Sequence, residues 1–268
     1  AGIYAIDALD HIGWNDYGQI TFVVVSDEEI GERHSVELLM REGERHDAVL
    51  TLEAARENGD IVTARKAGCW ITVIAQGKAA HAGVEPEKGR SATLAIANVI
   101  VDTFKLNGRK PGMTVNPGEI SGGRAPNIVS AEASAHFDLR AWTNADLEEL
   151  VTAFTQAAQA QPVPDVTITI ERDPGSGCPA MERTPGVVRL EEAAVRIASE
   201  LGFPLKGAAT GGGSDISFAG HAGTPGLDGL GPIGGLDHGP DEYVVTSSVA
   251  PRIALLAKLM TEITPNEG

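Results

Sequence analysis

Three acidic residues, Asp27, Glu28 and Glu29, stand in a row directly after the apolar segment 21–25 (Thr-Phe-Val-Val-Val). Such a short β-branched run predicts a central strand of a parallel sheet, and ligands of open α/β sheets bind beyond the carboxyl ends of such strands. Adjacent carboxylates repel one another by roughly 1 to 4 kcal/mol per close pair, depending on the effective dielectric. A bound divalent cation would offset this cost. The alternative is a solvated start of a helix, where the helix dipole favours Asp and Glu.

Two further residues have types and positions that suit a metal site. Glu53 ends the next predicted strand, residues 47–53. Because neighbouring parallel strands lie about 4.8 Å apart, acids at two such strand ends can share one cation, although Glu53 alone is better explained as a surface turn residue. His238 lies in a loop rich in Gly and Pro, residues 231–240. Loops on a rigid scaffold often carry functional groups, and the adjacent Asp237 either orients the imidazole or is simply solvated.

Two Gly-containing segments could serve a bound substrate. His81 lies in residues 77–83 (Gly-Lys-Ala-Ala-His-Ala-Gly), where a predicted strand turns into a loop, and its alternative role is that of an ordinary turn residue. Residues 210–215 (Thr-Gly-Gly-Gly-Ser-Asp) precede a predicted helix, and the amides of such a turn can bind phosphate or carboxylate. The segment lacks the Gly-Lys-Ser/Thr ending of a phosphate-binding P-loop. Neither Ser26 nor Ser214 sits in a Gly-x-Ser-x-Gly elbow, so no nucleophilic triad is indicated.

The elements that must position these residues follow two patterns. Before residue 65 and after residue 173, short strands alternate with helices, which is typical of a parallel α/β sheet. The expected elements are helix 2–12, strand 19–25, helix 34–41, strand 47–53, a helix capped by Thr184 and running from Pro185 to Leu201, strand 224–230 and helix 246–262.

Between these parts the order β-α-β-β-α-β predicts a ferredoxin-like arrangement. Its expected elements are strand 69–74, helix 91–106, strands 112–121 and 128–140, helix 144–159 capped by Asn144, and strand 165–172. The sequence therefore predicts a doubly wound, mostly parallel α/β domain (1–64 and 174–268) with a ferredoxin-like domain inserted at 65–173.

The composition limits which binding partners and which cellular compartment are expected for this chain. The net charge of −16 over 268 residues argues against a nucleic-acid or anionic-membrane partner. No apolar run approaches the roughly 20 residues of a membrane span. Cys69 and Cys178 lie in unlike contexts and are interpreted as reduced thiols, which fits the cytoplasm. The chain begins at Ala1, without Met and inside a predicted helix, and is therefore interpreted as having lost its beginning.

Taken together, these residues resemble the di-zinc exopeptidases and deacylases, the family of glutamate carboxypeptidase, succinyl-diaminopimelate desuccinylase, acetylornithine deacetylase and aminoacylase. The resemblance covers essentially the whole chain and is strongest to the branch of bacterial glutamate carboxypeptidase. The matching pieces, in family order, are residues 26–31 (Ser-Asp-Glu-Glu-Ile-Gly), 52–53, 77–83, Asn127, 138–140 (Asp-Leu-Arg), 210–215 and His238. The inserted domain falls where this family carries its dimerisation or lid domain.

The resemblance implies a role for each matching residue. Glu28 corresponds to the general base, and His81 to a histidine that reaches across the dimer to stabilise the oxyanion. Zinc ligands are matched by Glu29 and His238 for one ion and by Glu53 for the other. Substrate contacts are matched by Asn127, Arg140, Gly211 and Gly212. The implied cofactors are two zinc ions, with cobalt as a substitute.

The chain departs from the family at two places. Ala54 and Ala55 follow Glu53 where many relatives have a Pro. No residue matches the family's metal-binding His-x-Asp motif or its bridging Asp, which precede the first helix. Since zinc sites need three or four protein ligands, the 268 residues alone are expected to bind zinc weakly and to show little or no activity.

The sequence thus predicts a cytoplasmic, homodimeric zinc hydrolase that cleaves the amide bond of a peptidyl or N-acyl amino acid and releases an acidic C-terminal residue. An N-acyl amino acid deacylase or a dipeptidase of the same family is one alternative. A non-catalytic dimeric relative with an incomplete metal site is the other.

Overall fold

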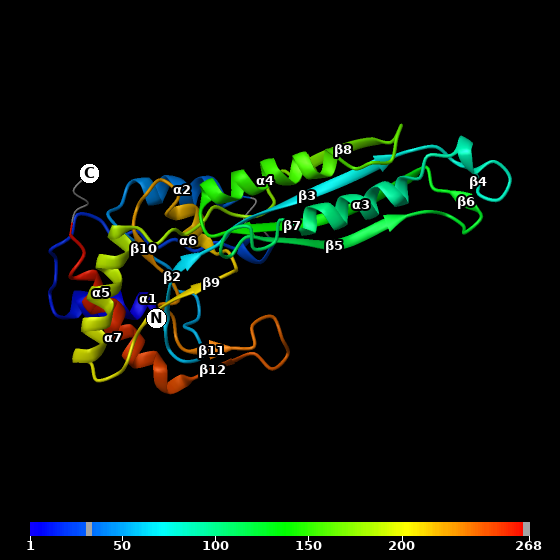
Figure 1. The fold of residues 1–268 in the computed structure, drawn as a ribbon. Helices are drawn as coiled ribbons and strands as arrows, with labels where there is room; N and C mark the ends of the chain where they lie inside the picture. Colours follow the sequence, from blue (N-terminus) through cyan, green and yellow to red (C-terminus); the bar gives the residue numbers. More distant parts are fainter. Residues whose placement is uncertain (31–33, 265–268) are drawn as a thin grey trace. The chain divides into compact units, whose positions relative to one another are not determined.

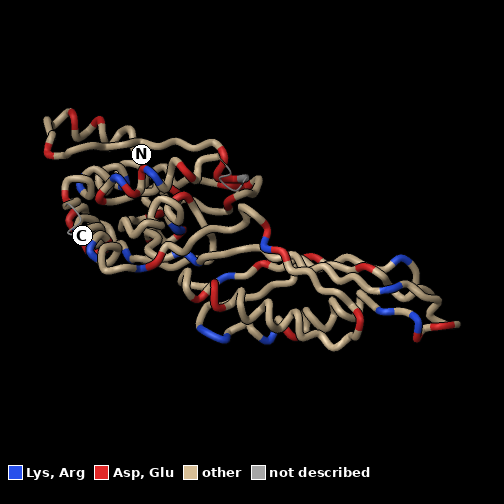
Figure 2. Tube along the Cα trace, turned by 90° about the horizontal axis from the view of Figure 1, so that it is seen from above, with Lys and Arg blue, Asp and Glu red and all other residues tan. Residues whose placement is uncertain are grey.

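The computed structural model describes residues 1–30 and 34–264, and the chain divides into two compact units. Unit 1 comprises Ala1–Arg65 and Pro179–Gly268, and unit 2 comprises Lys66–Cys178. Asp and Glu are distributed along the trace of both units (Figure 2). No helix of the described residues is long and apolar enough to cross a membrane.

Unit 1 has short strands among helices. Its strands form two parallel pairs, β1 (Val49–Leu50) with β10 (Gly226–Leu227) and β2 (Ile61–Arg65) with β9 (Gly207–Thr210), and one antiparallel pair, β11 (Gly234–Gly235) with β12 (Tyr243–Val244). Its helical elements are α1 (Gly2–His11), η1 (Glu28–Ile30), α2 (Val36–Glu44), α5 (Pro185–Glu200), α6 (Asp215–Ala219), η3 (Thr246–Ser248) and α7 (Val249–Met260). The expected mixed α/β class with parallel pairing is confirmed.

The core of unit 1 lies between α1, α5, α7 and the parallel strands (Figure 1). Fully buried apolar side chains come from the three helices and from β2 and β10, including Ile61, Ile197, Leu227 and Leu255. Thr184 caps α5 as expected, because its side chain accepts a hydrogen bond from the Val187 amide at 3.3 Å.

Close packing of α2 against α6 depends on a glycine. A Cβ atom built on Gly43 would lie 1.8 Å from the carbonyl oxygen of Ala219, so no larger residue fits without moving the backbone. This contact places α6, which follows the Gly-rich turn 211–213, against the helix that follows the acidic segment 27–29.

Unit 2 is a four-stranded antiparallel sheet in the order β5-β7-β3-β8, with two helices (Figure 1). Its elements are β3 (Ala67–Gln76), β4 (Ala80–His81), η2 (Pro86–Lys88), α3 (Ala92–Phe104), β5 (Thr114–Gly122), β6 (Ile128–Val129), β7 (Glu132–Ala141), α4 (Asn144–Gln159) and β8 (Thr167–Arg172). Side chains alternate between buried and more exposed along β3 and β7 because α3 and α4 cover one face of the sheet. Phe137 of β7 and Phe154 of α4 meet edge to face, 4.8 Å between ring centroids. The predicted ferredoxin-like arrangement is confirmed.

Two predictions about local structure are wrong. Residues 21–25 are not a strand: no described segment pairs with them, and Val24 is 78% exposed. Composition favours a strand only where a neighbouring strand supplies a ladder. Instead, the Phe22 ring lies against α1, where a Cβ atom on Gly2 would come within 2.6 Å of it. The cap of α4 is Thr143 rather than Asn144, since the Thr143 hydroxyl accepts the Asp146 amide at 3.0 Å.

Candidate functional site

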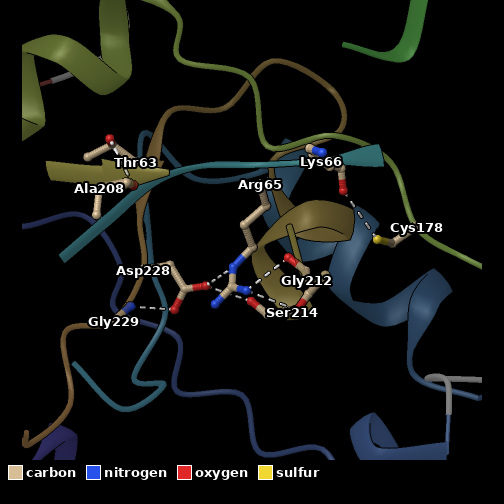
Figure 3. Close-up of polar contacts among 10 residues, drawn as sticks. Thr63, Arg65, Lys66, Cys178, Ala208, Gly212, Ser214, Asp228 and Gly229 are labelled. Carbon is tan, nitrogen blue, oxygen red and sulfur yellow. Dashed lines mark hydrogen bonds and ion pairs between the residues drawn. The ribbon is translucent and has the colours of Figure 1, made fainter. Parts of the chain in front are cut away.

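Unit 1 contains a buried ion pair. Arg65, the last residue of β2, donates from Nε to Oδ2 of Asp228 at 2.7 Å, and the two side chains are 9% and 0% exposed. Asp228 follows β10 and also accepts the Ser214 hydroxyl at 2.7 Å and the Gly229 amide. Figure 3 shows the guanidinium between Asp228 and the Gly-rich turn. The pair therefore ties together β2, the segment after β10 and the turn before α6.

Three carboxylates gather around this pair. Burial raises the pKa of Glu53 to about 7, assisted by the negative charges of Asp228 and Glu28. Burial also raises the pKa of Asp215 to about 6, with Glu28 and Asp228 contributing. The pKa of Glu28 is raised by burial and by the charge of Glu29, and the Arg65 charge opposes this shift. The acids at positions 28 and 53, which the sequence predicted to share one site, thus interact electrostatically in the structure.

Glycine permits one close approach at this site. The amide of Gly231 donates to the Glu53 carbonyl at 2.9 Å, and a Cβ atom at position 231 would lie 2.6 Å from the carbonyl oxygen of Leu52. Arg252 of α7, itself 2% exposed, holds the same segment by donating to the carbonyls of Gly229 and Gly231 at 3.0 Å each.

The structure also brings together the two predicted ligands of one metal ion. His238 Nδ1 lies 3.3 Å from Glu29 Oε2, and both side chains are largely exposed. His238 has a φ of +63°, an unusual backbone conformation for a residue other than glycine. An imidazole nitrogen beside a carboxylate oxygen suits zinc. Among the residues that the structure describes, however, no group of three or more His, Cys, Asp or Glu could hold an ion. The donors present therefore fit part of a zinc site and not a complete one.

Asp27, the first acid of the row, has a structural role. The residue is 7% exposed, and its carboxylate accepts a hydrogen bond from the His34 amide at 2.8 Å. This bond ties Asp27 to the residues just before α2. Gly31, the last residue of the matching motif, lies outside the described residues.

The Gly-rich turn faces Arg65 with its carbonyl groups. Arg65 Nη1 donates to the carbonyls of Gly212 and Gly213, at 3.0 and 3.1 Å. Gly211 and Gly212, the predicted amide donors to a substrate, both lie on the surface of unit 1. Their donation to a ligand stays a prediction.

The remaining predicted site residues belong to unit 2. His81 in β4 pairs with Ile128 of β6, and the Asn127 carbonyl accepts the Ala82 amide at 2.9 Å, so His81 and Asn127 lie in neighbouring segments. Arg140 in β7 makes a two-point contact with Asp138, from Nε to Oδ1 at 2.8 Å and from Nη2 to Oδ2 at 2.9 Å. The roles of these three residues stay predictions.

Sequence reasoning missed Arg65 and Asp228. A usable signal was present: Arg65 ends a β-branched run, residues 61–65, in which a charged side chain needs a buried partner. Asp228 lies between glycine and leucine residues in a predicted strand and gave no comparable signal.

Comparison with known proteins identifies the relatives of this chain. Residues 63–166 match the peptidase dimerisation domain of the M20 peptidases. Carboxypeptidase G2 from Pseudomonas sp. (strain RS-16) is 29% identical over 266 residues, which cover 97% of this chain and 63% of that protein. The chain is a homologue of carboxypeptidase G2 and contains an M20-type dimerisation domain. The resemblance drawn from the sequence motifs is therefore confirmed.

Solved structures of M20 peptidases agree with this relationship. Aminopeptidase PepT from Bacillus cereus has a TM-score of 0.81 at 25% identity, covering 97% of this chain and 68% of the PepT chain. A tripeptidase from Staphylococcus aureus has a TM-score of 0.74 at 24% identity, covering 97% and 68%, and shows the shared fold. The chain spans somewhat under two thirds of the length of carboxypeptidase G2.

Proposed function

We propose that this protein is a metal-dependent hydrolase. It cleaves the amide bond of a peptidyl or N-acyl amino acid and releases an acidic C-terminal residue. The observation that carries the proposal is the gathering of Glu28, Glu53 and Asp215 around the buried Arg65–Asp228 pair. Raised pKa values produced by burial and neighbouring charge are typical of functional sites. Homology to carboxypeptidase G2 supports a hydrolase acting at a chain end.

In this proposal the residues of unit 1 carry the chemistry. Glu29 and His238 would contribute ligands to one metal ion and Glu53 to another, and these ions would supply Lewis-acid chemistry at the scissile carbonyl when bound. Glu28 accepts the proton of the attacking water and delivers it to the leaving amine. Its half-buried carboxylate stands next to Glu29, so the base and the predicted ligand are fixed by the same short element η1.

The residues of unit 2 would recognise the substrate. Arg140 suits a carboxylate because its planar guanidinium can donate two parallel hydrogen bonds. Asn127 and His81 would contact the scissile region, with His81 supplied by the partner copy of a homodimer.

Removal of metal tests this function directly. We expect the protein to hydrolyse N-acetyl-L-glutamate or a peptidyl-glutamate in the presence of zinc or cobalt, and a chelator to lower the rate at least ~100-fold. Re-addition of the metal should restore the rate. Release of free glutamate is the measurement. A rate that the chelator leaves unchanged would contradict the proposal.

The similarity to PepT supports a second candidate, hydrolysis of short peptides from the amino end. Tripeptides and N-acyl glutamates assayed side by side on the same preparation separate the two. Faster hydrolysis of tripeptides would favour the second candidate.

The outer face of α3 supports the proposed homodimer. Leu94, Val101 and Phe104 lie on this helix, each more than half exposed, and residues 63–166 match a dimerisation domain. We expect Val101→Asp to weaken the dimer at least ~100-fold, because burying an unpaired carboxylate is costly. Sedimentation velocity over a range of protein concentrations measures the change. Val195→Asp, a change at an exposed valine of α5 in unit 1, is the matched control, and equal effects of the two variants would refute this interface.

A further inference from the structure

One face of the unit 2 sheet is covered by α3 and α4, and the opposite face, called the open face below, carries polar and aromatic side chains at one end of β3 and β7. The register of the two strands places Gly68 across from Arg140 and Trp70 across from Asp138. Trp70 is 53% exposed. Gly68 leaves room for its neighbour, because a Cβ atom there would lie 3.6 Å from Cγ of Arg140.

Lys66 belongs to the same end of the open face. It precedes β3 by one residue, and residues two apart along a strand share a face. Its ammonium lies 5.1 Å from the centroid of the Trp142 ring, which follows β7. The side chains of Lys66 and Arg140 therefore lie on the same face, on successive cross-strand positions.

The charges of this cluster do not balance. Asp138 accepts two hydrogen bonds from the Arg140 guanidinium and a third, at 3.1 Å, from the indole Nε1 of Trp70. Its carboxylate thus compensates the charge of Arg140. Among the described residues, no carboxylate forms an ion pair with Lys66, so one positive charge is left over in a chain whose net charge is −16.

Lys66 is also close enough to Arg140 for the two cations to repel one another. Burial and the charge of Arg140 lower the pKa of Lys66, and the charge of Asp138 opposes this shift. An anion bound between the two cations would relieve their repulsion and restore the charge balance of the cluster.

We propose that Lys66 is a specificity-determining residue: it supplies the uncompensated positive charge that selects an acidic side chain in the amino acid that the enzyme releases. This inference rests on the proposed function for the nature of the ligand. Every amino acid carries an α-carboxylate at its C-terminal end, so a preference for acidic residues needs a second cation. Arg140 alone is a weak source of such a preference, because Asp138 balances its charge.

Replacing Lys66 separates its charge from its packing. Lys66→Met keeps the length of the side chain and removes its charge, and Lys66→Arg keeps the charge. The probes are L-glutamate and L-glutamine, which have nearly the same shape and differ by one negative charge. We expect the wild type to bind L-glutamate about tenfold more tightly than L-glutamine, and Lys66→Met to lose this difference by weakening L-glutamate alone. Lys66→Arg should retain it. Titration calorimetry measures the affinities.

Tryptophan side chains report where the probe binds. In ¹H–¹⁵N spectra of the wild type, the indole peaks of Trp70 and Trp142 should shift on addition of L-glutamate, and they should respond less to L-glutamine. Trp14 of unit 1 is an internal control whose indole peak should stay in place. Lys258→Met is the matched control variant, because it removes the same charge from an exposed lysine of α7 that Glu200 already pairs. Its preference for L-glutamate should equal that of the wild type.

Each outcome decides the inference. A Lys66→Met protein that keeps the full preference for L-glutamate overturns it, and so do indole peaks of Trp70 and Trp142 that do not respond to L-glutamate. Equal weakening of both probes in Lys66→Met would also overturn it, since that result indicates a structural role. A charge-dependent preference that disappears in Lys66→Met, in a protein that hydrolyses no N-acyl or peptidyl amino acid, supports the inference and refutes the proposed function instead.

Discussion

Glu28→Gln is expected to lower kcat by about 10²- to 10⁴-fold, the usual contribution of a positioned general acid–base group. The substitution keeps the size of the side chain and removes its ability to accept a proton. Glu28 lies half-buried in η1, its charge acts on Glu53 and Asp215, and its neighbour Glu29 contacts His238. Rates of glutamate release by wild type and variant, at saturating substrate and with zinc supplied, measure the effect.

The comparison requires that the variant keep its metal and its fold. Zinc content by mass spectrometry and the urea unfolding midpoint should match the wild type, since Gln at position 28 leaves Glu29 and His238 in place. Glu37→Gln on the exposed face of α2 is the control, and we expect it to leave kcat unchanged. A Glu28→Gln enzyme with more than a tenth of the wild-type kcat would remove Glu28 from the role of general base.

The sequence predicted the inserted domain well because its elements are long and locally specified. The helix at 144–159 has its expected bounds, and the strand predicted at 69–74 lies within β3. Unit 1 was harder. Its parallel strands β1 and β10 span two residues each, which is too short for residue composition to predict them reliably. The β-branched segment 21–25 pairs with no strand among the described residues.

In the candidate site, too, the sequence predicted some residues and missed others. Acidic residues in a row and a histidine in a glycine-rich loop are visible from residue types, and the structure brings Glu29 and His238 together. The pair Arg65–Asp228 is separated by 163 positions, and only folding reveals that each supplies the charge that the other needs. Sequence patterns identify groups that contact a ligand more readily than groups that act through a buried partner.

Loss of the Asp228 charge should destabilise unit 1 strongly. Asp228→Asn leaves Arg65 as a buried cation without its partner, and breaking a buried ion pair in this way costs about 3 to 5 kcal/mol of unfolding free energy. Asp228 is fully buried and accepts hydrogen bonds from Arg65, Ser214 and Gly229, so no water molecule can readily replace the lost contacts. Urea unfolding followed by circular dichroism measures the change, and amide hydrogen exchange in β2 assigns it to unit 1.

Two further variants separate the charge from the general effect of substitution. Glu200→Gln removes an exposed carboxylate of unit 1 that contacts Arg196 and Lys258, and it should cost less than about 1 kcal/mol. The double variant Arg65→Met/Asp228→Leu removes both charges at once and should be less destabilised than Asp228→Asn, because no buried charge is left unpaired. A double variant that is less stable than Asp228→Asn would show that packing around the pair, rather than its charge balance, stabilises unit 1.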